Sequence, residues 1–221
     1  MLGDHEFVLD YPVLGPLRET SGVSSLETRD VRGRLGFLEA GFVMALLVAG
    51  LWLVEGVDTA DSHRLDQLGI EPRSGEGLLG IFLAPFLHAS WEHLVSNTVP
   101  FFVLGLVVLL DGWRRWGAIT LWIVVVSGAT VWLIAPAGTV TLGASGVIFG
   151  WLTYLIARGF YTRAPGQIAV GVVVLILYGT VLLGVIPTDS GISWQAHLGG
   201  AIGGLLAASR QRKHPVDPRW H

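Results

Sequence analysis

The stretch "LGASGVIFGW", residues 142–151, brings three glycines, an alanine and a serine to a point where a helix is predicted to begin. Small residues at such a point allow two helices to pack closely, as in G-x-x-x-G contacts. They also leave the hydroxyl group of Ser145 accessible. The stretch is therefore consistent with a packing role or a chemical role for this serine, and the surrounding sequence has to decide between them.

Composition identifies the class of protein. The chain has 221 residues, of which 52% are hydrophobic and 14% are charged. Soluble domains carry about 25% charged residues, so this is a membrane protein. The absence of cysteine excludes disulfides, thiol catalysis and cysteine-ligated zinc. The net charge of -3 provides no basic surface for nucleic acid, and we identify no cofactor or metal site in the sequence.

Six apolar segments follow a polar beginning. A spanning helix needs about 20 apolar residues, so three segments are long enough and three are short. The sequence therefore predicts an all-α membrane protein with six transmembrane helices, of which the fourth is short and starts inside the membrane. The segments are residues 37–54, 93–110, 118–135, 145–157, 168–186 and 194–209.

The positions of lysine and arginine predict the orientation in the membrane. With the segments above, 12 of the 14 basic residues lie on one side, and only Arg64 and Arg73 lie opposite. Basic residues accumulate on the cytoplasmic side, so both termini are predicted to be cytoplasmic in a multi-pass protein of the cell membrane. We expect a flexible N-terminal tail (1–36) without a signal peptide, a membrane domain (37–209) and a basic C-terminal tail (210–221).

The orientation allows the depths of polar residues to be compared. The second, fourth and sixth segments run from outside to inside. At about 1.5 Å per residue, Asn97 lies roughly 20 Å from the inner end of its segment, and Ser145 and His197 lie roughly 18 Å from theirs. In a hydrocarbon core of about 30 Å, all three side chains are then about 10 Å below the outer surface.

The fourth segment predicts a water-filled cavity at this level. A helix of residues 145–157, about 20 Å long, is too short to cross the bilayer. The preceding "APAGTVTLGA" (135–144) is typical of irregular backbone, which survives at membrane depth only where it is buried in protein or lines water. A helix start also has unbonded N–H groups and the positive end of the helix dipole, so Ser145 is predicted beside a site for negative charge.

The side chains expected at this level suit nucleophilic catalysis. A serine hydroxyl needs a base to take its proton, and neutral imidazole suits that role near pH 7, so His197 is the candidate base for Ser145. The backbone N–H of Ser145 is a candidate donor to an oxyanion. His93 and Asn97, at i and i+4 on one helix face, are two more. No acid lies at this depth, which predicts a Ser–His dyad, and Phe149 is placed to pack against the histidine ring.

Three motifs at these positions make the sequence resemble the rhomboid intramembrane serine proteases. "HLVSN" (93–97) matches the H-x-x-x-N of the family's second helix, and "GASG" (143–146) matches the G-x-S-G that opens its fourth. "AHLGGAIGG" (196–204) matches the A-H-x-x-G-x-x-x-G of its sixth helix. Each motif alone is weak, but their order on a six-helix topology is specific. The resemblance covers residues 37–209.

The resemblance implies a rhomboid-like six-helix bundle and an activity. The chain is expected to be an intramembrane serine endopeptidase with Ser145 as nucleophile, His197 as general base, and His93 with Asn97 as oxyanion stabilisers. The implied partners are the lipid bilayer and a substrate protein, whose transmembrane helix is unwound near its outer end and cleaved there. The residues expected to support the site are Gly143, Gly146, Phe149, Gly200 and Gly204.

The resemblance also assigns roles to the surrounding segments. In the family, the fifth helix and the loop after it act as gate and cap, which here are residues 168–186 and 187–193. Some members carry a Trp-Arg pair in the first external loop, whereas residues 55–84 contain no tryptophan.

Packing explanations compete for each residue. Ser145 also fits a helix crossing, His197 a buried histidine bonded to a carbonyl, and His93 with Asn97 an interhelical hydrogen bond without catalysis. The histidines outside the motifs are predicted to be solvated in tails or loops; they are His5, His63, His88, His214 and His221.

Two other functions fit a polar membrane interior. A small-solute transporter also has broken helices around polar groups, but the sequence has no two-half repeat and no carboxylate in the centre of any predicted helix. A non-proteolytic binder of membrane proteins is expected to lack Ser145 or His197, and both are present. There is no H-E-x-x-H zinc motif and no pair of intramembrane aspartates. The sequence favours a serine protease.

Overall fold

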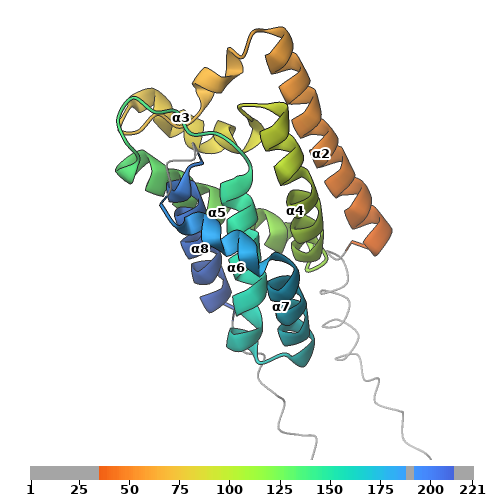
Figure 1. Ribbon diagram of the computed structural model, residues 1–221. Coiled ribbons are helices and arrows are strands. Elements are labelled where there is room, and N and C mark those ends of the chain that lie inside the picture. Colours follow the sequence, from red (N-terminus) through yellow and green to blue (C-terminus); the bar gives the residue numbers. More distant parts are fainter. Residues whose placement is uncertain (1–34, 188–191, 212–221) are drawn as a thin grey trace, which may run out of the picture. The chain divides into compact units, whose positions relative to one another are not determined.

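The structure, a computed structural model, describes residues 35–187 and 192–211. Within these ranges every element is helical apart from one isolated β-bridge, so the predicted all-α class is confirmed there (Figure 1). The α-helices are α2 (Phe37–Ala60), α3 (Gly75–Leu83), α4 (Trp91–Leu109), α5 (Trp113–Ile134), α6 (Ser145–Thr162), α7 (Pro165–Tyr178) and α8 (Trp194–Ser209). The 3-10 helices are η1 (Leu65–Leu68), η2 (Ala84–Phe86) and η3 (Gly179–Val185).

Among the described residues, four helical stretches are long and apolar enough to cross a membrane: α2, α4, α5, and α7 continued by η3. The predicted fourth and sixth segments correspond to α6, with 18 residues, and α8, with 16. The predicted tails lie outside the described residues except for 35, 36, 210 and 211, and so does most of the predicted cap, 187–193.

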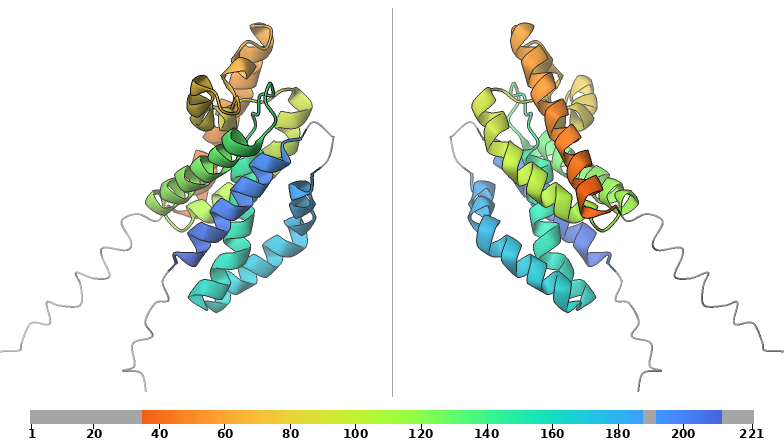
Figure 2. Two further views of the ribbon diagram at one scale, coloured as in Figure 1. Left: turned by 90° about the vertical axis from the view of Figure 1, so that its left-hand side faces the viewer. Right: turned by 90° about the vertical axis from the view of Figure 1, so that its right-hand side faces the viewer.

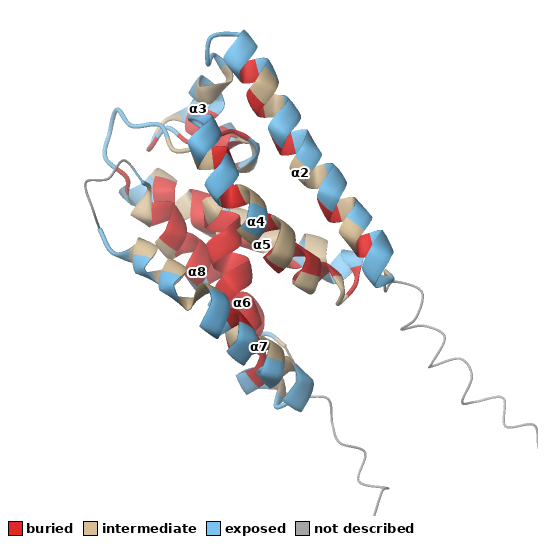
Figure 3. Ribbon diagram, turned by 45° about the vertical axis from the view of Figure 1, so that its right-hand side comes forward, coloured by how far each residue is buried: buried red, intermediate tan, exposed pale blue. Residues whose placement is uncertain are grey.

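Helix α6 forms the centre of the helical bundle. It contacts α4, α5, α7 and α8, and thirteen of its 18 residues are buried. Figure 3 shows this buried helix between more exposed neighbours. Trp151 and Leu152 are completely buried on it and pack in the main hydrophobic cluster with Met44 of α2 and Leu104 of α4. Burial of apolar area against other helices therefore fixes the position of α6 within the protein.

The end of α6 differs from the prediction. The sequence predicted that the helix ends at residue 157, before the charge of Arg158, but α6 continues to Thr162. The Arg158 side chain is buried, forms an ion pair with Asp111 just after α4, and lies over the ring of Tyr154. Because a paired and buried arginine is compatible with a helix interior, the charge does not end the helix.

The helices α2 and α7 lie at opposite edges of the bundle, as the two views of Figure 2 show. Only 17% of the apolar window of α2 and 11% of that of α7 with η3 is buried. Large apolar side chains such as Phe42, Leu53, Ile176 and Leu177 are exposed on them. These faces are suited to contact with lipid.

The segment between α2 and α4 is structured and is attached to α5. The guanidinium of Arg73 donates to the carbonyl oxygens of Leu133 and Ala135 at 3.1 and 2.8 Å, at the end of α5. The indole of Trp132 donates to the carbonyl of Ser74 at 2.8 Å. An arginine from the segment and a tryptophan from α5 thus anchor a loop that contains no tryptophan of its own.

Candidate active site

Ser145 is the first residue of α6, as the sequence predicted for the start of this helix. The N-cap residue, Ala144, has no side-chain group to accept a hydrogen bond from the first turn. Gly143 precedes it with φ of +121°, a conformation that favours glycine and turns the chain into the helix. The serine hydroxyl therefore lies beside an uncapped helix start, where backbone N–H groups and the helix dipole favour negative charge.

His197 lies on α8, and two contacts fix its ring. Its Nδ1 is 2.8 Å from the carbonyl oxygen of Gly184 in η3, and the ring of Phe149 stacks on it with centroids 4.0 Å apart and planes 6° apart. A carbonyl can only accept, so neutral His197 carries its proton on Nδ1 and has a lone pair on Nε2. This Nε2 atom is buried and makes no hydrogen bond to any described residue, including Ser145.

Glycines bring α6 and α8 together. A Cβ atom on Gly200 would overlap the carbonyl oxygen of Gly146, and one on Gly204 would overlap that of Gly150. The hydroxyl of Thr153 adds a hydrogen bond of 2.9 Å to the carbonyl of Ala201. The helices that carry the serine and the histidine thus meet backbone to backbone, with the most extensive contact of any helix pair in the described chain.

His93 and Asn97 both lie on α4, but their side chains have different surroundings. The imidazole of His93 packs against the backbone of Gly143, because a Cβ atom there would lie 2.6 Å from Cε1 of the histidine. Asn97 is buried, and its Nδ2 makes no hydrogen bond within the described residues. Both side chains carry N–H groups, but only His93 lines a cavity together with Ser145.

This cavity has a volume of about 840 Å³ and is bounded by α4, the loop before α6, and the start of α8. His93 and Ser145 line it, whereas His197 and Asn97 are not among its lining residues. Its volume is sufficient for an extended peptide of a few residues. The other polar side chains around it are Ser90, Glu92, Ser96, Thr139, Thr141, Ser193 and Gln195.

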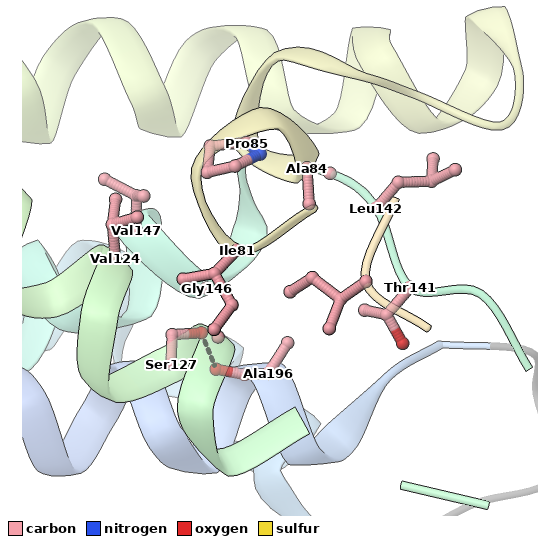
Figure 4. Close-up of a pocket in the computed structure, with 13 residues that line it drawn as sticks. Ile81, Ala84, Pro85, Val124, Ser127, Thr141, Leu142, Gly146, Val147 and Ala196 are labelled. Carbon is pink, nitrogen blue, oxygen red and sulfur yellow. Dashed lines mark hydrogen bonds between the residues drawn. The ribbon is translucent and has the colours of Figure 1, made fainter. Parts of the chain in front are cut away.

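A second cavity of about 20 Å³ lies beside Gly146, where α3, α5, α6 and α8 meet (Figure 4). Ile81, Ser127 and Ala196 are among its lining residues, and the hydroxyl of Ser127 donates to the carbonyl of Ala196 at 2.8 Å. This space is about the size of one water molecule. Of these two cavities, the larger is the one with room for a peptide.

Comparison with known proteins assigns the family. A model of the rhomboid domain matches residues 75–213, more than half of the chain. The chain belongs to the rhomboid family. Uncharacterised proteins of Mycobacterium bovis and Mycobacterium tuberculosis are each 41% identical over 191 residues, which cover 82% of this chain and 79% of theirs. The rhomboid-like protease 5 of Toxoplasma gondii is 35% identical over 128 residues, 55% of this chain and 15% of that protein.

Membership of the rhomboid family and the four apolar spans among the described residues make this an integral membrane protein. The family match also includes the segments that carry all the candidate residues, from His93 to His197. The three predicted motifs therefore lie on α4, at the start of α6 and on α8, and α6 contacts both other helices.

The sequence analysis missed one histidine in this rhomboid protein. His88 was predicted to be a solvated loop residue, but the structure buries it with 1% of its surface exposed. Its ring meets that of His93 edge to face at 5.2 Å, and neither of its nitrogens bonds to a described residue. Burial, with a smaller contribution from His93, lowers the pKa of His88 to about 4. The apolar run 81–87 directly before His88 was the sequence feature that could have indicated its burial.

Proposed function

We propose that the protein is an intramembrane serine endopeptidase that uses a dyad of Ser145 and His197. The observation that carries the proposal is the state of His197. Its Nδ1 is bonded to a carbonyl and its ring is stacked on Phe149, while its Nε2 has no partner among the described residues. Such an imidazole is oriented as a general base, and it sits on the helix packed most extensively against that of Ser145.

The reaction follows from this arrangement. Nε2 of His197 takes the proton of the Ser145 hydroxyl as Oγ attacks the carbonyl carbon of the substrate. The imidazolium then gives that proton to the leaving amine, and a water molecule, activated by the same histidine, hydrolyses the acyl-enzyme. The nucleophile–base hydrogen bond is often long without substrate and shortens when the substrate binds, so its absence here is compatible with the mechanism.

The oxyanion of the tetrahedral intermediate needs donors at the start of α6. The backbone N–H of Ser145, the imidazole of His93 and the amide of Asn97 are the groups we assign to it. The unpartnered Nδ2 of Asn97 supports this assignment, since a buried amide donor without a partner is costly unless a ligand completes it.

The substrate we propose is a transmembrane helix of another membrane protein. Six helices would then cross the bilayer, namely α2, α4, α5, α6, α7 with η3, and α8, with both termini in the cytoplasm and the larger cavity open to the outside. The limited burial of α7 supports entry of the substrate past this helix. The similarity to a rhomboid-like protease supports the same reaction.

Cleavage of a single-span model substrate by the purified protein in detergent tests the proposal. The Ser145→Ala and His197→Ala variants are expected to lose activity to background, because each removes one half of the dyad. Ser96→Ala is the matched control, since Ser96 lines the same cavity but bonds to a carbonyl of its own helix. It is expected to retain near wild-type turnover.

A fluorophosphonate probe gives a second measurement that needs no substrate. It is expected to label the wild type and Ser96→Ala, and not Ser145→Ala, because only an activated serine reacts. Cleavage that persists in Ser145→Ala would refute the dyad, and a folded wild type that neither cleaves nor reacts would favour a non-proteolytic binder.

A further inference from the structure

A group of titratable side chains lies where α2 ends, in a part of the chain that the proposed reaction does not use. Asp58, His63 and Asp66 each offer one ligand atom, and these atoms lie within 4.8 Å of one another. The carboxylate of Asp58 is 2% exposed, whereas His63 is 45% exposed and leaves a path to solvent.

The chain turn after α2 sets the spacing of the ligand atoms. Ser62 and His63 both have positive φ, 59° and 58°, which returns the chain over the end of the helix. The N–H of Leu65 donates to Oδ1 of Asp58 at 2.7 Å and orients that carboxylate. Its Oδ2 is then 3.4 Å from Nδ1 of His63, which is itself 3.8 Å from Oδ2 of Asp66.

These separations match a metal coordination shell. With metal–ligand bonds of about 2.0 to 2.1 Å, two ligands of a tetrahedral zinc ion are about 3.4 Å apart. The His63–Asp58 separation already has that value, and the His63–Asp66 separation needs only a small side-chain adjustment. An imidazole beside carboxylates suits zinc or manganese, whereas calcium and magnesium prefer oxygen ligands alone.

Glu55 provides the independent evidence. It lies one turn before Asp58 on α2 and is 1% exposed, and neither of its carboxylate oxygens has a hydrogen-bond partner among the described residues. The charges that act on this carboxylate are those of Asp66, Asp58 and His63. A buried carboxylate without a partner costs several kcal/mol, and further carboxylates beside it raise the cost.

Asp58 and Asp66 also have buried carboxylate oxygens that lack hydrogen-bond partners in the described chain. These atoms are Oδ2 of Asp58 and Oδ1 of Asp66. Burial raises the pKa of Asp66, and the neighbouring Asp58 carboxylate raises it further. The ligand atoms of two carboxylates and one imidazole thus lie within 4.8 Å of one another, their charges act on the buried Glu55 carboxylate, and a cation would offset the repulsion among the carboxylates.

We propose that Asp58, His63 and Asp66 bind one divalent transition-metal ion, zinc or manganese, at the end of α2, and that the same ion offsets the charge of the buried Glu55 carboxylate. The sequence analysis identified no metal site here. The ion ties the end of α2 to η1 and stabilises the segment that leads to α3. This site is independent of the proposed protease activity, so neither proposal depends on the other.

Titration of the full-length protein tests the site. The protein is purified with a histidine-free affinity tag, treated with a chelator, and titrated with ZnCl₂, MnCl₂ or CaCl₂ in a calorimeter. One equivalent of zinc or manganese is expected to bind and to raise the unfolding temperature. His63→Gln and Asp66→Asn are expected to weaken binding at least tenfold, since each removes a direct ligand.

Asp61→Asn is the matched control, because Asp61 is exposed and pairs only with Arg64, at 3.7 Å, in the described structure. It is expected to bind like the wild type. His63 is half exposed, so His63→Gln keeps the test informative if Asp66→Asn fails to fold. The proposal is overturned if neither zinc nor manganese binds with 1:1 stoichiometry, if His63→Gln binds them as well as the wild type, or if calcium binds more tightly than both.

Discussion

Single residues control how closely α6 and α8 approach. Gly200 and Gly204 give the carbonyl groups of Gly146 and Gly150 the space that a methyl group would occupy. Interiors are packed to near-crystalline density, so one added carbon at such a contact has to move a helix. The position of His197 relative to Ser145 therefore depends on residues that carry no side chain.

A graded series of alanine substitutions tests this dependence. Gly200→Ala is expected to lower stability by about 1–3 kcal/mol and to abolish cleavage, because the new methyl group overlaps a backbone carbonyl. Gly203→Ala is expected to cost less, since the nearest atoms lie at 3.3 Å. Gly41→Ala, with nothing within 4 Å, is expected to be neutral or stabilising by up to about 1 kcal/mol.

Thermal unfolding of the three variants in one detergent measures their stability, and the cleavage assay measures their activity. Equal effects at Gly200 and Gly41 would show that the helices do not meet as closely as described.

His88 makes stability depend on pH. Its folded pKa of about 4 lies below the ordinary value of 6.5, so the unfolded chain binds this proton more readily. The folded state therefore keeps the full contribution of His88 above pH 6.5 and loses it progressively as pH falls toward 4. The loss attributable to His88 approaches about 3 kcal/mol at pH 4.

Unfolding temperatures of the wild type and His88→Phe between pH 7.5 and 4 measure this difference. The variant is expected to lose less stability on acidification than the wild type. Parallel curves for the two proteins would contradict the buried, neutral state of His88.

At the scale of elements, the attachment of the α2–α4 segment to α5 depends on Arg73. Its two hydrogen bonds reach carbonyl groups that the end of α5 leaves without helical partners. Arg73→Ala is expected to lower stability by about 1 kcal/mol, since a charged donor is lost at an exposed position. It is also expected to speed hydrogen exchange in residues 69–83.

Arg64→Ala is the control, because Arg64 forms only a surface ion pair with Asp61 in the described structure. Exposed pairs contribute little, so this variant is expected to match the wild type. Similar exchange rates in both variants would mean that the segment is anchored elsewhere.

The elements also show what the sequence could predict. The start of α6 at Ser145 and the range of α8, 194–209, follow from local signals: small residues, glycine patterns and apolar runs. The end of α6 could not be predicted, because the ion pair that buries Arg158 comes from Asp111, 47 residues away.

The candidate site residues show the same division between local and long-range signals. The motifs located His93, Ser145 and His197, but not the carbonyl of Gly184 that orients the imidazole across η3. The Asp58–His63–Asp66 group depends on two non-glycine residues with positive φ, Ser62 and His63, and no sequence motif signals such a turn. The burial of His88 likewise depends on residues that are distant in the sequence, and local sequence patterns do not reveal it.

At the scale of the whole molecule, the distribution of basic residues predicts the orientation. The chain contains no cysteine, so single cysteines can report it directly. Ala60→Cys, exposed at the end of α2, is expected to react with a membrane-impermeant maleimide on intact cells. Ser209→Cys, exposed at the end of α8, is expected to react only after permeabilisation.

Both variants have to be labelled equally in detergent for the comparison to count. The reverse pattern on intact cells would invert the orientation and would place the larger cavity on the cytoplasmic side.

The backbone contact between α6 and α8 has a consequence for how lipids act on this protein. A seam of carbonyls against glycines has no flexible side chains with which to adjust, so its two helices move as one rigid unit. The α7 helix packs on α6 but buries only 11% of its apolar window with η3, so it is the span that a change in bilayer thickness is expected to displace first. If α7 is the substrate gate of the proposed protease, membrane composition would alter substrate entry more than the contact between α6 and α8.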